Sequence, residues 1–213
     1  MSALFTRLSE LHEVGHARED IDLAPDFGSW PGEEVRDAAV LVAITERERP
    51  GVLLIHRPSN MRAHPGQVAF PGGKIDPGES PVEAALREAH EELGIDPAQV
   101  RIVGESDLFR TRTGYAITPV IGMVPPDLDL SPNPAEVAQW FEAPLDHIFD
   151  PANQKHVTAE FSVGPRSFWE IMWQEHRIWG VTGALVVNLS RRLAWHGSGH
   201  GPADNAGRGS GHD

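Results

Sequence analysis

One amphipathic helix is signalled more strongly than any other element of this chain and constrains the fold most. Ser80 and Glu83 have the spacing of a capping box, in which two side chains satisfy backbone N–H groups at a helix start. Pro81 stands at the first helical position and Gly94 follows the last one, so we expect a helix over residues 81–93. At about 100° per residue, its apolar side chains form one stripe. Such a stripe is typical of a helix that packs on a sheet.

Strand-like segments lie on both sides of this helix. Residues 37–45 and 51–56 are apolar runs of strand length, and the Arg49-Pro50-Gly51 turn between them predicts a hairpin. Pro71-Gly72-Gly73 predicts a sharp break in the chain. The other expected elements are helices at 2–17 and 179–193, strands at 68–70, 100–103, 115–124 and 137–141, a helical turn at 144–149, and a hairpin of strands 156–163 and 167–173. Helices alternating with strands indicate an α/β fold.

Three glutamates share a second face of the helix at 81–93. Glu88, Glu91 and Glu92 occupy positions i, i+3 and i+4, where like charges destabilise a helix by a few tenths of a kcal/mol per pair, roughly. A solvated acidic face is one interpretation. The other is a metal site, because Mg²⁺ prefers oxygen ligands and bridges to substrate phosphates. The residues around the helix favour the metal site.

The helix belongs to a longer motif. Gly73 is followed six residues later by Glu79, and after seven more residues the chain reads Arg-Glu-Ala-His-Glu-Glu-Leu-Gly-Ile over 87–95. Every fixed position of the Nudix box is matched, so the chain resembles the Nudix hydrolases. The resemblance implies an α/β/α sandwich with a mixed central sheet. It also implies hydrolysis of a nucleoside diphosphate linked to another group, with Mg²⁺ or Mn²⁺ as cofactor.

A second motif lies directly upstream of the box. It contains Leu53-Leu54, an arginine at 57, an Arg-x-His-x-Gly run over 62–66 and Phe-Pro-Gly-Gly over 70–73. It resembles the accessory signature of the coenzyme A diphosphatase branch, as do segments 114–120, 136–145 and 179–182, although His56 and Pro58 depart from the branch's usual residues. The implied substrate is coenzyme A or a thioester, cleaved to 4′-phosphopantetheine (or its acyl form) and 3′,5′-ADP. The alternatives are another nucleotide, such as ADP-ribose or NADH, and a binding module without catalysis.

The resemblance also implies roles for the box residues. Glu88 and Glu92 are the first choices as metal ligands, with Glu91 sharing a site or orienting a water. Arg87 either holds the loop through an ion pair with Glu79 or contacts substrate. The general base stays open among Glu91, Glu92 and Glu136, whereas for His64, which could also serve, we favour a substrate contact.

The substrate contacts carried over from the family form a second group. They are Arg57, Arg62, His64, Gly72, Gly73, Lys74 and Tyr115. Arg57 and Arg62 suit the extra phosphate of coenzyme A, because a guanidinium binds phosphate bidentately. The glycines let the backbone approach a ligand closely. Lys74 is either a phosphate contact or an exposed loop lysine, and Tyr115 either stacks on adenine or packs in the core.

Charge and composition limit the partners. With 18 Lys and Arg against 31 Asp and Glu, the net charge of −13 argues against binding to nucleic acid or anionic membranes. Residues 49–75 nevertheless contain four basic and no acidic side chains, which favours a local anion site. The chain has no cysteine, which excludes disulfides and thiolate chemistry. Because residues 1–20 lack the apolar core of a signal peptide, we predict a cytoplasmic protein.

Three parts make up the expected domain organisation. Residues 1–35 form an N-terminal helix and connector, 36–194 the Nudix hydrolase domain, and 195–213 a Gly/His-rich tail. After Trp195 the chain has no apolar residue larger than alanine, so we expect the tail to be disordered rather than a histidine metal site. The family resemblance is compatible with a homodimer, and we expect Trp169, Trp173 and Trp179 to lie in the core or in its interface.

Overall fold

A mixed sheet forms the frame of the protein. The computed structural model describes residues 2–26, 35–58, 66–161 and 164–195, and within them eight strands join in this sheet. Its main path runs β3 (Val68–Ala69), β2 (Gly51–His56), β1 (Arg36–Thr45), β7 (Tyr115–Val124) and β5 (Arg101–Glu105). Three further strands pair beside this path: β4 (Gly72–Lys74) with β1, β6 (Phe109–Arg110) with β7, and β8 (Gln139–Pro144) with β2. β1 and β7 run parallel along their whole length, whereas the other pairs are antiparallel.

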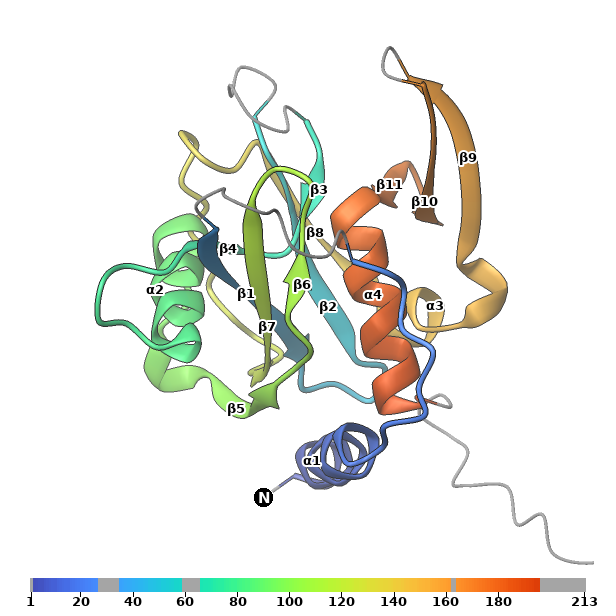
Figure 1. Cartoon of the computed structure of the whole chain (residues 1–213). Coiled ribbons are helices and arrows are strands. Elements are labelled where there is room, and N and C mark those ends of the chain that lie inside the picture. Colours follow the sequence, from blue (N-terminus) through green and yellow to red (C-terminus); the bar gives the residue numbers. More distant parts are fainter. Residues whose placement is uncertain (1, 27–34, 59–65, 162–163, 196–213) are drawn as a thin grey trace, which may run out of the picture.

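Helices cover both faces of this sheet (Figure 1). Helix α2 (Pro81–Leu93) packs on one face, and α4 (Gly180–Leu193) with α1 (Ala3–His16) on the other. Neighbouring residues of a strand therefore enter different cores: Leu41 faces α2, and Val42 faces α4. The result is an α/β/α sandwich around a mixed sheet, which confirms the expected fold class.

A smaller antiparallel sheet lies beside α4 (Figure 1). It contains β9 (Lys155–Phe161), β10 (Gly164–Trp173) and β11 (His176–Trp179). The 3₁₀ turn η1 (Pro97–Gln99) precedes β5, while the short helix α3 (Leu145–Ile148) and the 3₁₀ turn η2 (Pro151–Asn153) connect β8 to β9. Trp169 and Trp173 pack against the α4-side core, and Trp179 makes an edge contact with Phe168.

The helix at 81–93 is confirmed at both ends. The Glu83 N–H donates to Ser80 Oγ at 3.2 Å, and the Ser80 N–H donates to Glu83 Oε2 at 2.8 Å, which completes the capping box. Gly94 ends the helix with φ at +72°. The hairpin at the Arg49-Pro50-Gly51 turn is also confirmed, since β1 and β2 pair antiparallel.

Two expectations about strands are wrong. The expected break at Pro71-Gly72-Gly73 is partly a strand, because Gly72–Lys74 pair with residues 38–40 of β1. This pairing uses backbone groups, and the residue types of the segment do not indicate a strand. The strand expected at 137–141 begins at Gln139 instead, because the Val137 N–H closes a turn onto the Asn133 carbonyl.

Several expectations concern residues that the structure does not describe. Arg62 and His64 lie outside the described residues, as does the tail beyond Trp195. Among the described residues, no helix combines the length and hydrophobicity needed to cross a bilayer.

Candidate active site

Two glutamates of α2 extend over the glycines of β4. Glu92 lies one turn after Glu88 on the helix, and its Oε2 accepts the Gly72 N–H at 2.9 Å. A methyl group on Gly73 would overlap the Glu88 carboxylate. The absence of a side chain at Gly73 therefore allows the Glu88 carboxylate to lie directly against the strand, whereas at Gly72 it allows close pairing with β1, since a methyl group there would overlap the Ala39 carbonyl oxygen.

The loop between β7 and β8 brings a third carboxylate to the same place. Its N–H groups at Ser131 and Asn133 donate to the Leu93 and Glu92 carbonyls at 2.8 and 2.9 Å, which satisfies acceptors in the last turn of α2. The Asn133 side-chain amide then donates to Glu136 Oε1 at 3.2 Å. As a result, one carboxylate oxygen from each of Glu88, Glu92 and Glu136 lies within 4.8 Å of the others.

Burial makes negative charge costly in this three-carboxylate cluster. Glu92 is 2% exposed, and burial raises its pKa to about 8; the Gly72 N–H and Arg57 oppose this rise, whereas Glu88 and Glu136 add to it. Burial also raises the pKa of Glu88, against the hydrogen bond and charge of Arg87. A bound cation would offset this cost. Three carboxylate oxygens are a donor set that suits Mg²⁺ or Mn²⁺.

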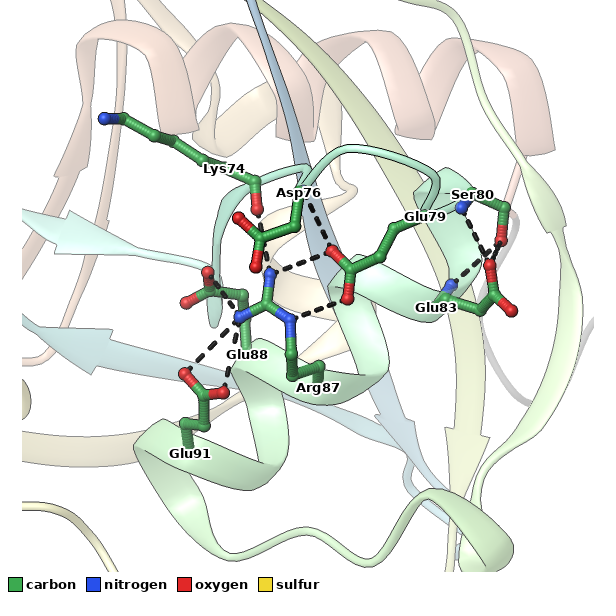
Figure 2. Close-up of polar contacts among 8 residues, drawn as sticks. All are labelled: Lys74, Asp76, Glu79, Ser80, Glu83, Arg87, Glu88 and Glu91. Atoms are coloured by element: carbon green, nitrogen blue, oxygen red, sulfur yellow. Dashed lines mark hydrogen bonds and ion pairs between the residues drawn. The ribbon is translucent and has the colours of Figure 1, made fainter.

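Arg87 connects the loop at residues 74–79 to helix α2 through hydrogen bonds (Figure 2). Its Nε and Nη2 donate to the two oxygens of Glu79 at 2.8 and 3.1 Å, and Nη2 also donates to the Lys74 carbonyl at 3.0 Å. Its Nη1 donates to Glu88 Oε1 at 3.0 Å. These carboxylates raise the pKa of Arg87, which keeps it charged. The ion pair between Arg87 and Glu79, one of the two roles considered for Arg87, is therefore present. The same guanidinium also donates a hydrogen bond to Glu88.

Glu91 lies apart from the three-carboxylate cluster. Its side chain is 48% exposed, and its carboxylate accepts at 3.4 Å from Arg87 Nη1, the same nitrogen that donates to Glu88 (Figure 2). The structure thus brings Glu136, rather than Glu91, next to Glu88 and Glu92. Glu91 as a metal ligand stays a prediction.

A cavity of about 470 Å³ opens beside the cluster. Its lining includes eight of the residues singled out from the sequence, namely Arg57, Gly72, Gly73, Lys74, Glu88, Glu92, Tyr115 and Glu136. The α4 residues Val181, Thr182 and Leu185 form an opposite wall. The expected substrate contacts that the structure describes therefore lie around one space, next to the carboxylates.

Sequence reasoning missed other lining residues, among them Arg36, Thr111 and Thr113. The Arg36 guanidinium carbon lies 4.1 Å from the centre of the Tyr115 ring. This contact follows from the parallel pairing of β1 with β7, in which Arg36 and Tyr115 are direct neighbours. Because the pairing joins segments far apart in the chain, no local pattern could have indicated it.

Comparison with known proteins shows which family this chain resembles. Residues 35–163 match the family model of the NUDIX domain. The chain is 40% identical over 159 residues to a protein of Enterobacter sp. (strain 638) named uncharacterized Nudix hydrolase NudL, covering 74% of this chain and 83% of the relative. A protein of the same name from Photorhabdus laumondii is 37% identical over 159 residues, covering 74% and 85%. The crystal structure of a MutT protein from Methanosarcina mazei Go1 gives a TM-score of 0.46 at 23% identity, covering 56% of this chain and 84% of that one.

The α/β sandwich and its box of glutamates thus define an enzyme class, the hydrolases of pyrophosphate-containing substrates. Within that class, this chain belongs to the Nudix hydrolase family.

Proposed function

We propose that this Nudix hydrolase cleaves the diphosphate of coenzyme A or its thioesters, with Mg²⁺ or Mn²⁺, to 3′,5′-ADP and 4′-phosphopantetheine or its acyl form. The observation that carries the proposal is the three-carboxylate cluster on the wall of a cavity that Arg57 and Lys74 also line. A cation on the carboxylates and cationic side chains nearby would together suit a diphosphate. The upstream motif around Arg57, which resembles the coenzyme A branch, supports this substrate over other dinucleotides.

Glu88 and Glu92 hold the cation in this proposal. When bound, a divalent cation neutralises phosphate oxygens and makes water a stronger acid. Arg87 acts as a positioning residue, because its hydrogen bonds to Glu79 and Glu88 fix the loop and one ligand together. Arg57 and Lys74 line the cavity and orient the diphosphate oxygens.

We assign the general base to Glu136. Glu92 is buried against the Gly72 N–H, and Glu91 accepts from Arg87 and is not among the residues that line the cavity. Glu136 lines the cavity and accepts one amide hydrogen bond, so its carboxylate keeps further lone pairs for a proton. Glu136→Gln should therefore lower kcat by about a hundredfold or more at saturating Mg²⁺.

Product analysis tests the proposed function. Purified protein incubated with coenzyme A should release 3′,5′-ADP with Mg²⁺ or Mn²⁺ and none with EDTA. Glu92→Gln should abolish this release, whereas Glu48→Gln, a matched change at an exposed residue of the β1–β2 turn, should not. If ADP-ribose or NADH is cleaved with higher kcat/KM than coenzyme A, the substrate assignment is wrong.

We further propose that the enzyme acts in the cytoplasm as a homodimer. The resemblance to the coenzyme A branch is compatible with a dimer, and the chain has no cysteine that could form a disulfide. Light scattering at micromolar concentration should give about twice the chain mass of 23.3 kDa. A measured mass equal to that of one chain would contradict the dimer.

A further inference from the structure

Arg36 lies at the end of the cavity remote from the carboxylates. Arg36, Ala38 and Val40 are alternate residues of β1, and all three line the cavity. Val40 pairs with Gly72, whose N–H holds Glu92. The cluster is therefore level with Val40, and Arg36 is four residues further along the strand. At about 3.3 Å per residue, the Cα atoms of Val40 and Arg36 are about 13 Å apart.

The Arg36 side chain is held in place by β7 and the turn before it. Its guanidinium stacks on the Tyr115 ring, and its Nη2 donates to the Thr113 carbonyl at 2.7 Å. The backbone N–H of Arg36 donates to the Gly114 carbonyl at 2.9 Å. One face and one N–H of the guanidinium are thus used to fix it. A guanidinium has five N–H donors, so others are left for a ligand in the cavity that the side chain lines.

Charge differs between the two ends of the cavity. Its acidic lining residues are Glu88, Glu92 and Glu136, which all belong to the cluster. Within the described part of the chain, Arg87 and Arg192 are ion-paired with carboxylates, whereas no such ion pair involves Arg36. The end of the cavity at Arg36 therefore combines a fixed cation with no acidic lining residue.

Arg57 belongs to the other end. The His56 carbonyl, one residue before Arg57, accepts the Ala138 N–H at 2.9 Å, so Arg57 lies beside the loop that carries Glu136, and both residues line the cavity. A cation there would meet the diphosphate that the cluster binds. An additional phosphate on the substrate, on the side of the diphosphate that faces Arg36, would meet a different cation.

We infer that Arg36 binds the phosphate monoester at the nucleotide end of the substrate, the 3′-phosphate in coenzyme A, and that Arg57 instead contacts the diphosphate. The inference deepens the proposed function and rests on it for the identity of the nucleotide. It makes Arg36 a specificity-determining residue that the upstream motif does not contain. The ligand class of this subsite is a nucleoside 3′,5′-bisphosphate.

Substrate pairs test this assignment in the kinetics. Wild-type protein should prefer coenzyme A to dephospho-coenzyme A, which lacks the 3′-phosphate. Arg36→Ala should lower kcat/KM for coenzyme A by about ten- to a hundredfold and leave dephospho-coenzyme A within about twofold. Arg57→Ala should lower both values alike, and Arg49→Ala, an exposed arginine of the β1–β2 turn, should lower neither. An equal loss on both substrates in Arg36→Ala would refute the subsite.

A binding measurement separates this inference from the proposed function. Calorimetry with Mg²⁺ should show that wild type binds 3′,5′-ADP more tightly than 5′-AMP, and that Arg36→Ala removes the difference while Arg36→Lys restores part of it. Thermal unfolding of each variant checks that it is folded. Normal bisphosphate binding without coenzyme A hydrolysis would refute the function and keep the subsite. Hydrolysis of coenzyme A with no dependence of bisphosphate binding on Arg36 would refute the subsite and keep the function.

Discussion

Replacing Glu92 by glutamine should change how the stability of the metal-free protein depends on pH. The Glu92 carboxyl is 2% exposed, and burial raises its pKa from the ordinary 4.5 to about 8. The folded protein therefore binds this proton more tightly than the unfolded chain does. The stabilisation is fully present below pH 4.5 and is lost as the pH rises through 8. Glutamine has the same shape and no charge, and its side-chain oxygen can still accept the Gly72 N–H.

The size of the effect follows from the pKa difference. One pKa unit corresponds to about 1.4 kcal/mol, so the complete loss is about 5 kcal/mol. About 3 kcal/mol of it falls between pH 5.5 and 8.5. Carboxyls with lowered pKa, such as Glu79 and Asp107, lose their contribution at lower pH, as the pH falls through their folded pKa values. Burial lowers the pKa values of His16 and His56, so these groups also affect stability near the acidic end of this window, and the comparison with Glu92→Gln is what isolates the Glu92 carboxyl.

Urea unfolding in EDTA at pH 5.5 and 8.5 measures this loss. Wild type should lose about 3 kcal/mol more than Glu92→Gln over this range, and the exposed control Glu48→Gln should behave as wild type. Saturating Mg²⁺ at pH 8.5 should stabilise wild type and leave Glu92→Gln nearly unchanged, because ligand binding stabilises the folded state only where the site is intact. If both proteins show the same pH dependence in EDTA, the Glu92 carboxyl is ionised in the folded protein and the burial argument fails.

Three further substitutions test how the site is held together. Asn133→Ala removes the amide that donates to Glu136, and kcat should fall about tenfold at saturating Mg²⁺; unchanged kcat would show that this hydrogen bond does not position the carboxylate. Arg87→Lys replaces the guanidinium, which donates two hydrogen bonds to Glu79, by a single ammonium. Steady-state kinetics should show kcat lowered by about tenfold or more with little change in KM. Gly73→Ala brings a methyl group into overlap with the Glu88 carboxylate. Metal-dependent activity should then fall by about tenfold or more, while the free energy of unfolding falls by only about 1–3 kcal/mol. Activity near wild type in this last variant would mean that Glu88 can move without consequence.

The parts of this protein that could be predicted from the sequence depend on local spacing. The helix at 81–93 is determined by its cap residues and by one apolar stripe, which lie within a few residues of each other. The i and i+4 spacing of Glu88 and Glu92 puts both carboxylates on one side of it. The strand at 115–124 is likewise readable from its apolar run and has the expected bounds.

Other features depend on contacts between segments far apart in the chain. Glu136 was one of three candidates for the base, because its place beside Glu92 comes from a loop that caps the end of α2 through backbone hydrogen bonds. Arg36 was not a candidate, since the expected strand began one residue later and parallel pairing of β1 with β7 cannot be read from either segment alone. Glu91 shows the opposite case: its spacing predicts a role shared with Glu88 and Glu92, but its exposed carboxylate contacts Arg87, and Glu136 joins the other two glutamates instead.

The glycines of β4 explain how one site can use both faces of the sheet. Glu88 and Glu92 come from α2 on one face, whereas the cavity is walled by Val40 and α4 on the other. The two sides meet at β4, which pairs with only residues 38–40 of β1. Gly73 has no side chain there, so the Glu88 carboxylate lies directly over the strand, and Glu92 accepts the Gly72 N–H beside it. In this protein the first glycine of the box is therefore needed together with the glutamates, because a side chain at Gly73 would overlap the Glu88 carboxylate.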